Sequence, residues 1–152
     1  MIVETVVTDT QVLPFSVAAV ESPAEEWRVI PGSEGYYSVS SLGRVRSEPT
    51  QTSRMGRQRG RILTCGRDSK GYFQFRMCLP GGRQRTMKVH RAVALAFLGP
   101  RPPAAQINHV SGDKTDNSPA NLEYVTCREN VRHAWRMGLR RVEQVQGENH
   151  GR

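Results

Sequence analysis

The final third of the chain carries the pattern that most limits its fold: two short strands, a polar loop between them and a capped helix. Apolar residues predict strands over 106–110 and 122–125, with a polar loop over 111–121. Thr126 and Glu129 then form a capping box, in which each side chain satisfies a backbone N–H group at the helix start. We therefore expect a hairpin followed directly by a helix.

The predicted helix runs to about Met137 and ends at Gly138, a residue typical of helix C-caps. We expect its buried stripe to consist of Val131, Ala134 and Trp135. An adjoining polar face carries Asn130, His133 and Met137 at helical spacing. A hairpin packed on this helix would bring three positions to one side: Asn108-His109, Asn121 and Asn130.

Strands are also predicted upstream of this unit. Strands over 36–40 and 44–47 are joined by a tight turn at Leu42-Gly43, with Trp27 expected as a core anchor. After a basic, turn-rich linker over 50–60, a short strand is predicted over 61–65 and a polar loop over 66–71.

The clearest strand in the sequence lies over 72–79. It alternates strictly, with Phe73, Phe75, Met77 and Leu79 on one face. The chain turns at 80–82, returns as a strand over 83–89 and continues as a helix over 90–98. The fold class is therefore α+β, with a small antiparallel sheet and a helix ahead of the final hairpin and helix. Aromatic residues make up only 7%, so we expect a modest core that is split into small pieces.

The chain divides into four predicted parts. Residues 1–22 form an acidic arm without a period that would bury a face, and 23–60 form a β-rich module with the basic linker. Residues 61–138 form the main α+β domain, and 139–152 form a polar tail.

Charge is the strongest compositional indication of a partner. The net charge is +8, and residues 44–91 alone hold 13 basic and two acidic side chains. Such a density repels itself unless a polyanion is present, so it favours DNA or RNA binding over a merely solvated basic face. Arginine outnumbers lysine 19 to 3, and arginine forms forked contacts with phosphates and guanine edges.

Other classes of protein are excluded or disfavoured by the sequence. The longest dense apolar stretch, 89–98, is far shorter than the roughly 20 residues of a membrane helix, and no secretory signal precedes it. The three cysteines, Cys65, Cys78 and Cys127, form no C-x-x-C pair, so neither a disulfide framework nor a structural zinc is expected. These features favour a reducing, cytoplasmic setting.

The polar residues of the final unit fit the chemistry of phosphodiester hydrolysis. A histidine can take a proton from water near neutral pH, since its ordinary pKa lies near 6.5. Amide oxygens can share a hard cation such as Mg²⁺ with the substrate phosphate. One histidine and several asparagines therefore meet these needs.

At these residues the chain resembles the HNH endonucleases of phage and intron-homing type. The resemblance is carried by Ile107 to Asn117, Asn121 to Thr126, Glu129-Asn130 and His133-Ala134, and upstream by Val89 to Phe97. Residues 27–47, with the run Leu42-Gly43-Arg44-Val45-Arg46-Ser47, resemble the small DNA-binding module often fused to such nucleases.

This resemblance implies a ββα-metal nuclease domain over 61–138 that hydrolyses double-stranded DNA in a bacterial or phage-infected cell. By position, His109 would be the general base, Asn121 would brace its loop, and Asn108 and Asn130 would offer oxygens to Mg²⁺ or Mn²⁺. DNA contacts are expected from the following residues: Arg44, Arg46, Arg54, Arg57, Arg59, Arg61 and His133. We expect a monomer, with a dimer as the alternative.

Several alternatives stay open at this stage. His133 could bind phosphate or metal, or only cap a polar helix face, and His90 is interpreted as a structural residue at the helix entry. The loop around Asp113 and Asp116 lacks the spacing of a calcium loop and is interpreted as a turn. A DNA-binding protein on the same scaffold, with little or no cleavage, is the alternative function.

Overall fold

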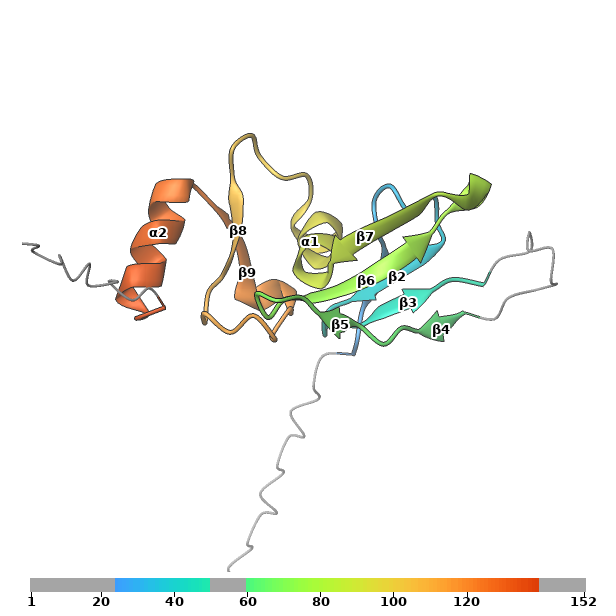
Figure 1. The fold of residues 1–152 in the computed structure, drawn as a ribbon, viewed down its shortest axis with the longest axis horizontal. Helices are drawn as coiled ribbons and strands as arrows, with labels where there is room; N and C mark the ends of the chain where they lie inside the picture. Colours follow the sequence, from blue (N-terminus) through green and yellow to red (C-terminus); the bar gives the residue numbers. More distant parts are fainter. Residues whose placement is uncertain (1–23, 50–59, 140–152) are drawn as a thin grey trace, which may run out of the picture.

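The computed structural model describes residues 24–49 and 60–139, and its fold is α+β, as predicted. Two antiparallel sheets of four and three strands are followed by a two-stranded hairpin and a final helix. In Figure 1 the β8–β9 hairpin stands between α2 at one end and α1 with the larger sheets at the other. The predictions for 1–22, 50–59 and 140–152 lie outside the described residues.

The N-terminal sheet has the order β1-β2-β3-β4, with every neighbouring pair antiparallel. Its strands are β1 (Trp27–Val29), β2 (Tyr37–Ser40), β3 (Val45–Ser47) and β4 (Arg61–Ile62). The strand predicted over 61–65 is thus shorter than expected. Because β4 pairs with β3, this sheet extends past residue 60 into the predicted main domain.

The second sheet confirms the alternation predicted for 72–79. It contains β5 (Gly66–Arg67), β6 (Phe73–Cys78) and β7 (Gln84–Lys88), with a 3-10 turn at Pro80–Gly82 between the last two. Phe75 and Met77 are buried, whereas Arg76 and Cys78 are exposed.

The predicted loop over 66–71 is wrong in its first two residues, which form β5. The side chain of Asp68 accepts hydrogen bonds from the backbone N–H groups of Lys70 and Tyr72, both at 2.9 Å. This turn folds Gly66 and Arg67 back onto β6, so the strand depends on backbone pairing and not on apolar periodicity.

The helix predicted over 90–98 has two parts. Helix α1 spans Val89–Val93, and a π-helical turn, η2, continues it over Ala94–Leu98. It ends at Gly99, whose φ of +88° favours glycine.

The described part of the chain has one hydrophobic core, so the expectation of a core in small pieces was wrong. Buried side chains of β2 and β3 pack with those of β6, β7 and α1 in one cluster. The Tyr37 hydroxyl also accepts a hydrogen bond of 2.9 Å from the Cys78 backbone N–H group across the two sheets. The N-terminal sheet and the second sheet are therefore one packed body.

The final unit is the predicted hairpin and helix. It consists of β8 (Gln106–His109), a 3-10 turn η3 (Pro119–Asn121), β9 (Leu122–Val125) and α2 (Cys127–Arg136). The capping box of Thr126 and Glu129 is present. At the other end, the backbone N–H groups of Gly138 and Leu139 donate to the carbonyls of Trp135 and Ala134, which closes the helix as a Schellman motif.

The two tryptophans are not core anchors. Trp135 is 47% exposed, because α2 has no fully buried residue and faces the hairpin only through half-buried side chains such as Val131 and Ala134. Trp27 is half-buried beneath the Arg44 and Arg46 guanidinium groups, which lie 5.7 and 4.4 Å from its ring centroid. Within the described residues, no helix has the length and apolar character of a bilayer span.

Candidate active site

A polar cleft of about 330 Å³ lies between the β8–β9 hairpin and α2. Four of the side chains predicted for the site line it: Asn108, His109, Asn130 and His133. Strand β8 supplies the first two, and successive turns of α2 supply the others. The hairpin and helix thus bring these four residues together, whereas Asn121, predicted for the same side, does not line the cleft.

Hydrogen bonds fix the tautomer of His109. The Asn117 amide nitrogen donates to the carbonyl oxygen of Thr115 at 3.1 Å, so the Asn117 oxygen faces the histidine ring. That oxygen lies 3.3 Å from His109 Nε2 and can only accept, so Nε2 carries the proton. The lone pair is then on Nδ1, which is the nitrogen available as a base.

The surroundings of His109 favour its neutral form. The residue is 6% exposed, and its ring lies 5.2 Å from the His90 ring and 6.0 Å from the Tyr72 ring. Burial lowers the pKa of His109 below its ordinary value, although the hydrogen bond that the ring donates to Asn117 opposes this shift. A neutral imidazole is the form that can accept a proton from water.

Asn121 spans the loop that follows His109. Its side-chain oxygen accepts from the Ser111 backbone N–H group at 2.8 Å, and its nitrogen donates to the Asp116 carbonyl at 2.8 Å. The Asp113 carboxylate accepts from the Thr115 backbone N–H group at 2.8 Å, which confirms the interpretation of this loop as a turn. Asn121 therefore ties together the loop that carries Asn117 to the histidine.

The residues that could hold a metal ion offer amide oxygens. Asn108 lies on β8 and Asn130 on α2, and both line the cleft. Their nitrogens donate to Glu123 at 2.8 Å and to Gln106 at 2.6 Å, so each carbonyl oxygen stays free of these bonds. In residues 24–49 and 60–139, no three His, Cys, Asp or Glu side chains form a metal-binding group. Neutral oxygens of this kind fit Mg²⁺ or Mn²⁺ better than a soft metal.

His133 is held by a hydrogen bond to the hairpin. Its Nε2 atom lies 3.0 Å from the Val110 carbonyl oxygen, an acceptor, so Nε2 donates and Nδ1 takes no part in this bond. The bond ties α2 to the end of β8. This hydrogen bond is compatible with both interpretations of His133, as a residue that binds phosphate or metal and as one that only caps a polar helix face.

The structure adds three residues that sequence reasoning did not assign to the site. Tyr72 and Lys114 line the cleft, and the Lys114 ammonium lies 4.9 Å from the Tyr72 ring. Asn117 is the third, through its contact with His109. Asn117 lies in the loop between the two predicted strands, but only the folded loop shows which of its polar residues faces the histidine.

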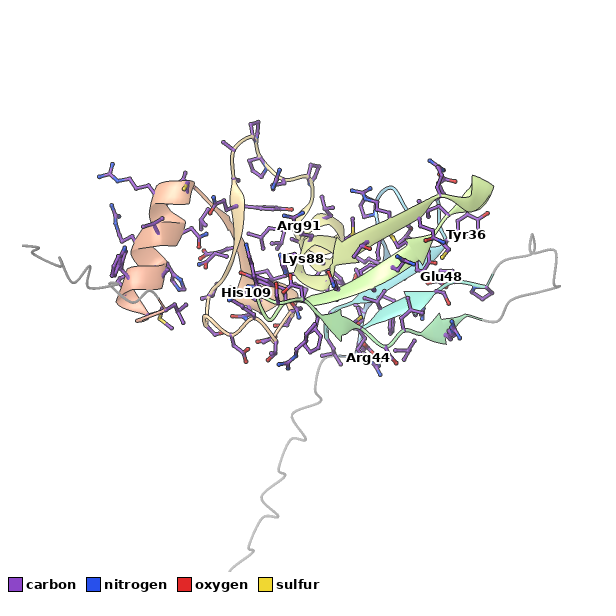
Figure 2. All side chains as sticks on the ribbon, viewed as in Figure 1. Tyr36, Arg44, Glu48, Lys88, Arg91 and His109 are labelled. Carbon is purple, nitrogen blue, oxygen red and sulfur yellow. The ribbon has the colours of Figure 1, made fainter. Side chains whose placement is uncertain are left out.

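The predicted DNA-contacting arginines are placed differently. Arg44 forms an ion pair with Glu25, and Arg46 pairs with Glu48 at 2.9 Å, so both guanidinium groups already have a carboxylate partner, and their contact with DNA stays a prediction. Figure 2 shows Arg44 and Glu48 at the two ends of β3. Arg61 is exposed on β4, and Arg54, Arg57 and Arg59 lie outside the described residues.

Comparison with known proteins agrees with this geometry. Residues 87–132 match the HNH endonuclease family, and residues 25–78 match the NUMOD4 motif. The chain carries an HNH endonuclease domain and a NUMOD4 motif. The HNH match begins at the end of β7 and includes His109, Asn121 and Asn130, and the NUMOD4 match includes β1 to β6.

The chain is homologous to HNH endonucleases of viruses and phages, among them the homing endonuclease I-HmuI. It is 31% identical to the DNA endonuclease I-HmuI of Bacillus phage SP01 over 80% of this chain and 64% of that protein. It is 36% identical to the uncharacterized HNH endonuclease L247 of Acanthamoeba polyphaga mimivirus, over 73% of this chain and 26% of that one. This chain therefore spans less than two thirds of either relative.

A solved structure shares the fold. The structure of DNA binding and cleavage by the HNH homing endonuclease I-HmuI superposes with a TM-score of 0.65 and 31% identity, covering 80% of this chain and 64% of that one. The α+β arrangement of antiparallel sheets, hairpin and helix is thus the fold of an HNH homing endonuclease.

Proposed function

We propose that this HNH domain hydrolyses phosphodiester bonds of double-stranded DNA with the help of a divalent metal. The observation that carries the proposal is His109, buried with Nε2 against the Asn117 oxygen, in one cleft with two asparagine amides. Nδ1 takes a proton from a water molecule as that water attacks the phosphorus. The products are a 5′-phosphate and a 3′-hydroxyl.

The metal is assigned to Asn108 and Asn130, whose amide oxygens suit Mg²⁺ or Mn²⁺. When bound, the ion supplies positive charge for the phosphate and for the leaving 3′ oxygen. Lys114, which lines the same cleft, adds a fixed positive charge for the phosphate. Asn121 holds the loop, and through it Asn117, so that the histidine ring keeps its orientation.

General affinity for DNA is assigned to exposed arginines without a carboxylate partner. Within the described residues, Arg44 and Arg46 form ion pairs with carboxylates, whereas Arg61 and Arg76 form none. Arg61 and Arg76 line one shallow surface pocket where β4 meets β6. Contacts of this kind strengthen binding to any DNA sequence and weaken with salt. The basic linker over 50–60 is assigned the same role.

The two matches support a division of labour, with the NUMOD4 match running on to residue 78. We propose that 61–138 holds the cleavage machinery and that 23–60 adds DNA contacts, in a monomer acting in the cytoplasm of a bacterial or phage-infected cell. The phage origin of I-HmuI supports this setting.

A plasmid assay tests the activity. Supercoiled plasmid should be converted to the nicked or linear form with Mg²⁺ or Mn²⁺, and EDTA should stop the conversion. The alternative function, DNA binding on an HNH scaffold, predicts a mobility shift with intact plasmid under all metal conditions. Intact plasmid at every metal concentration, with DNA bound, would therefore reject the nuclease.

A further inference from the structure

A carboxylate lies directly behind the proposed metal site. Asn108 and Glu123 are cross-strand partners in the β8–β9 hairpin, and the Asn108 amide nitrogen donates to Glu123 Oε1 at 2.8 Å. Directly opposed residues on one sheet face are close enough for such a contact. Asn108 is 7% exposed, whereas Glu123 is open to solvent.

This contact determines which way the Asn108 amide faces. An ionised carboxylate can only accept hydrogen bonds, so the amide must present its NH₂ group to Glu123. The carbonyl oxygen then lies on the opposite side of the amide. Asn108 lines two neighbouring clefts. His109 lines the first of them, and Glu123 lines only the second. Because Asn108 also lines the cleft of His109 and Asn130, its carbonyl oxygen is the amide atom left to face that cleft.

Charge gives Glu123 a second role. The two amides proposed as ligands are neutral. The positive charge of a divalent ion held by them alone would not be balanced by any negative charge until a phosphate binds. A carboxylate hydrogen-bonded to a ligand orients that ligand and makes it a better electron donor, and removing such a partner typically costs about 10- to 100-fold in metal affinity.

We propose that Glu123 is a positioning residue of the metal site, which turns the Asn108 oxygen toward the ion and supplies the negative charge that the amides lack. This inference rests on the proposed function, because it assigns the ion to the same cleft. The Asn108–Glu123 pair then provides one amide and one carboxylate, and exchanging the two should preserve the site.

The test uses the full chain with two variants and a control. Glu123→Gln removes the charge and lets the Asn108 amide face either way, since glutamine both donates and accepts. The double variant Asn108→Asp with Glu123→Gln exchanges the pair. Glu34→Gln is the control, because it removes an equal charge from the β1–β2 turn, where Glu34 pairs with Arg83.

Mn²⁺ binding is measured from the loss of the free-ion EPR signal, and unfolding temperature is measured without metal. We expect Glu123→Gln to raise the Mn²⁺ dissociation constant about tenfold or more. The exchanged pair should restore the wild-type value or bind more tightly, and Glu34→Gln should not change it. The Mn²⁺ midpoint of plasmid nicking should move in parallel.

Three results would overturn the inference: no Mn²⁺ binding by the wild type in the millimolar range, an unchanged dissociation constant in Glu123→Gln, or no recovery in the exchanged pair. A lower unfolding temperature of Glu123→Gln with unchanged Mn²⁺ affinity would mark Glu123 as a hairpin residue only. Failure of the proposed function is distinguishable from these results. If the Mn²⁺ affinities of wild type and variants follow the expected order but no protein nicks DNA, only the nuclease assignment is rejected.

Discussion

The buried His90 should make the protein sensitive to acid. Its side chain is 7% exposed and packs between Tyr72 and His109, with ring centroids 4.9 and 5.2 Å away. Its Nδ1 atom is buried without a hydrogen-bond partner. Burial, together with the neighbouring His109, Arg91 and Lys88, lowers the pKa of His90 to about 3, although Asp68 opposes the shift.

The sign of the effect follows from proton linkage. His90 has a lower pKa in the folded protein than in the unfolded chain, where it is about 6.5, so the unfolded chain binds the proton first as pH falls. Stability is then lost progressively between about pH 6.5 and pH 3. From these two values, the free energy of unfolding should fall by about 2 to 3 kcal/mol between pH 7 and pH 4.5 through this residue. That is a large share of a typical stability of about 5–15 kcal/mol.

The variant His90→Phe tests this argument. It keeps a planar ring against Tyr72 and His109 but removes the titrating nitrogens. Urea unfolding at pH 7 and pH 4.5 should show wild type losing about 2 to 3 kcal/mol more than the variant, a difference of roughly 1 to 2 M in the urea midpoint. At pH 7 the variant should be at least as stable, because the unpaired buried nitrogen is gone. Parallel losses in both proteins would refute the reasoning.

Three further predictions concern the helix cap, the catalytic loop and the DNA surface. Thr126→Ala removes the capping box of α2 and should cost about 1 kcal/mol of unfolding free energy in urea titrations, and an unchanged midpoint would contradict the cap. Gly43→Ala should slow plasmid nicking, because Gly43 has a φ of +73° and a new Cβ atom would lie 3.0 Å from the Asn117 side chain; unchanged nicking would mean that this contact does not support the site. Arg76→Ala should weaken binding to all DNA sequences and lower the salt slope by about one, as measured by fluorescence anisotropy, whereas Arg46→Ala should change the slope less because Glu48 already pairs with Arg46. Equal slopes in these two variants would contradict the assignment of the DNA surface.

Local patterns in the sequence predicted the parts of the fold that local interactions determine. The capping box at Thr126, the C-cap at Gly138 and the alternation of 72–79 each depend on residues within a few positions of one another, and the structure confirms them. The order of hairpin and helix around His109 was predicted for the same reason.

The features that the sequence did not predict concern distant partners. Arg44 was expected to contact DNA, and the structure adds a carboxylate partner, Glu25, that lies 19 residues away in the sequence. Trp135 was expected to be buried, but its exposure depends on how little of the hairpin α2 covers. Glu123 was not assigned to the site, because only the strand register places it opposite Asn108. Periodicity shows which face of an element is apolar, but it does not show which residue of another element meets that face.

The central claim is that His109 is the base of a metal-dependent nuclease, and His109→Ala tests it most directly. Nicking of supercoiled plasmid at saturating Mg²⁺ should be compared between wild type and variant, with DNA affinity measured by anisotropy on the same preparations. We predict that nicking falls by about 10²-fold or more while DNA affinity stays close to wild type, because the ring acts on water and not on binding. Near-normal nicking by the variant would contradict the account.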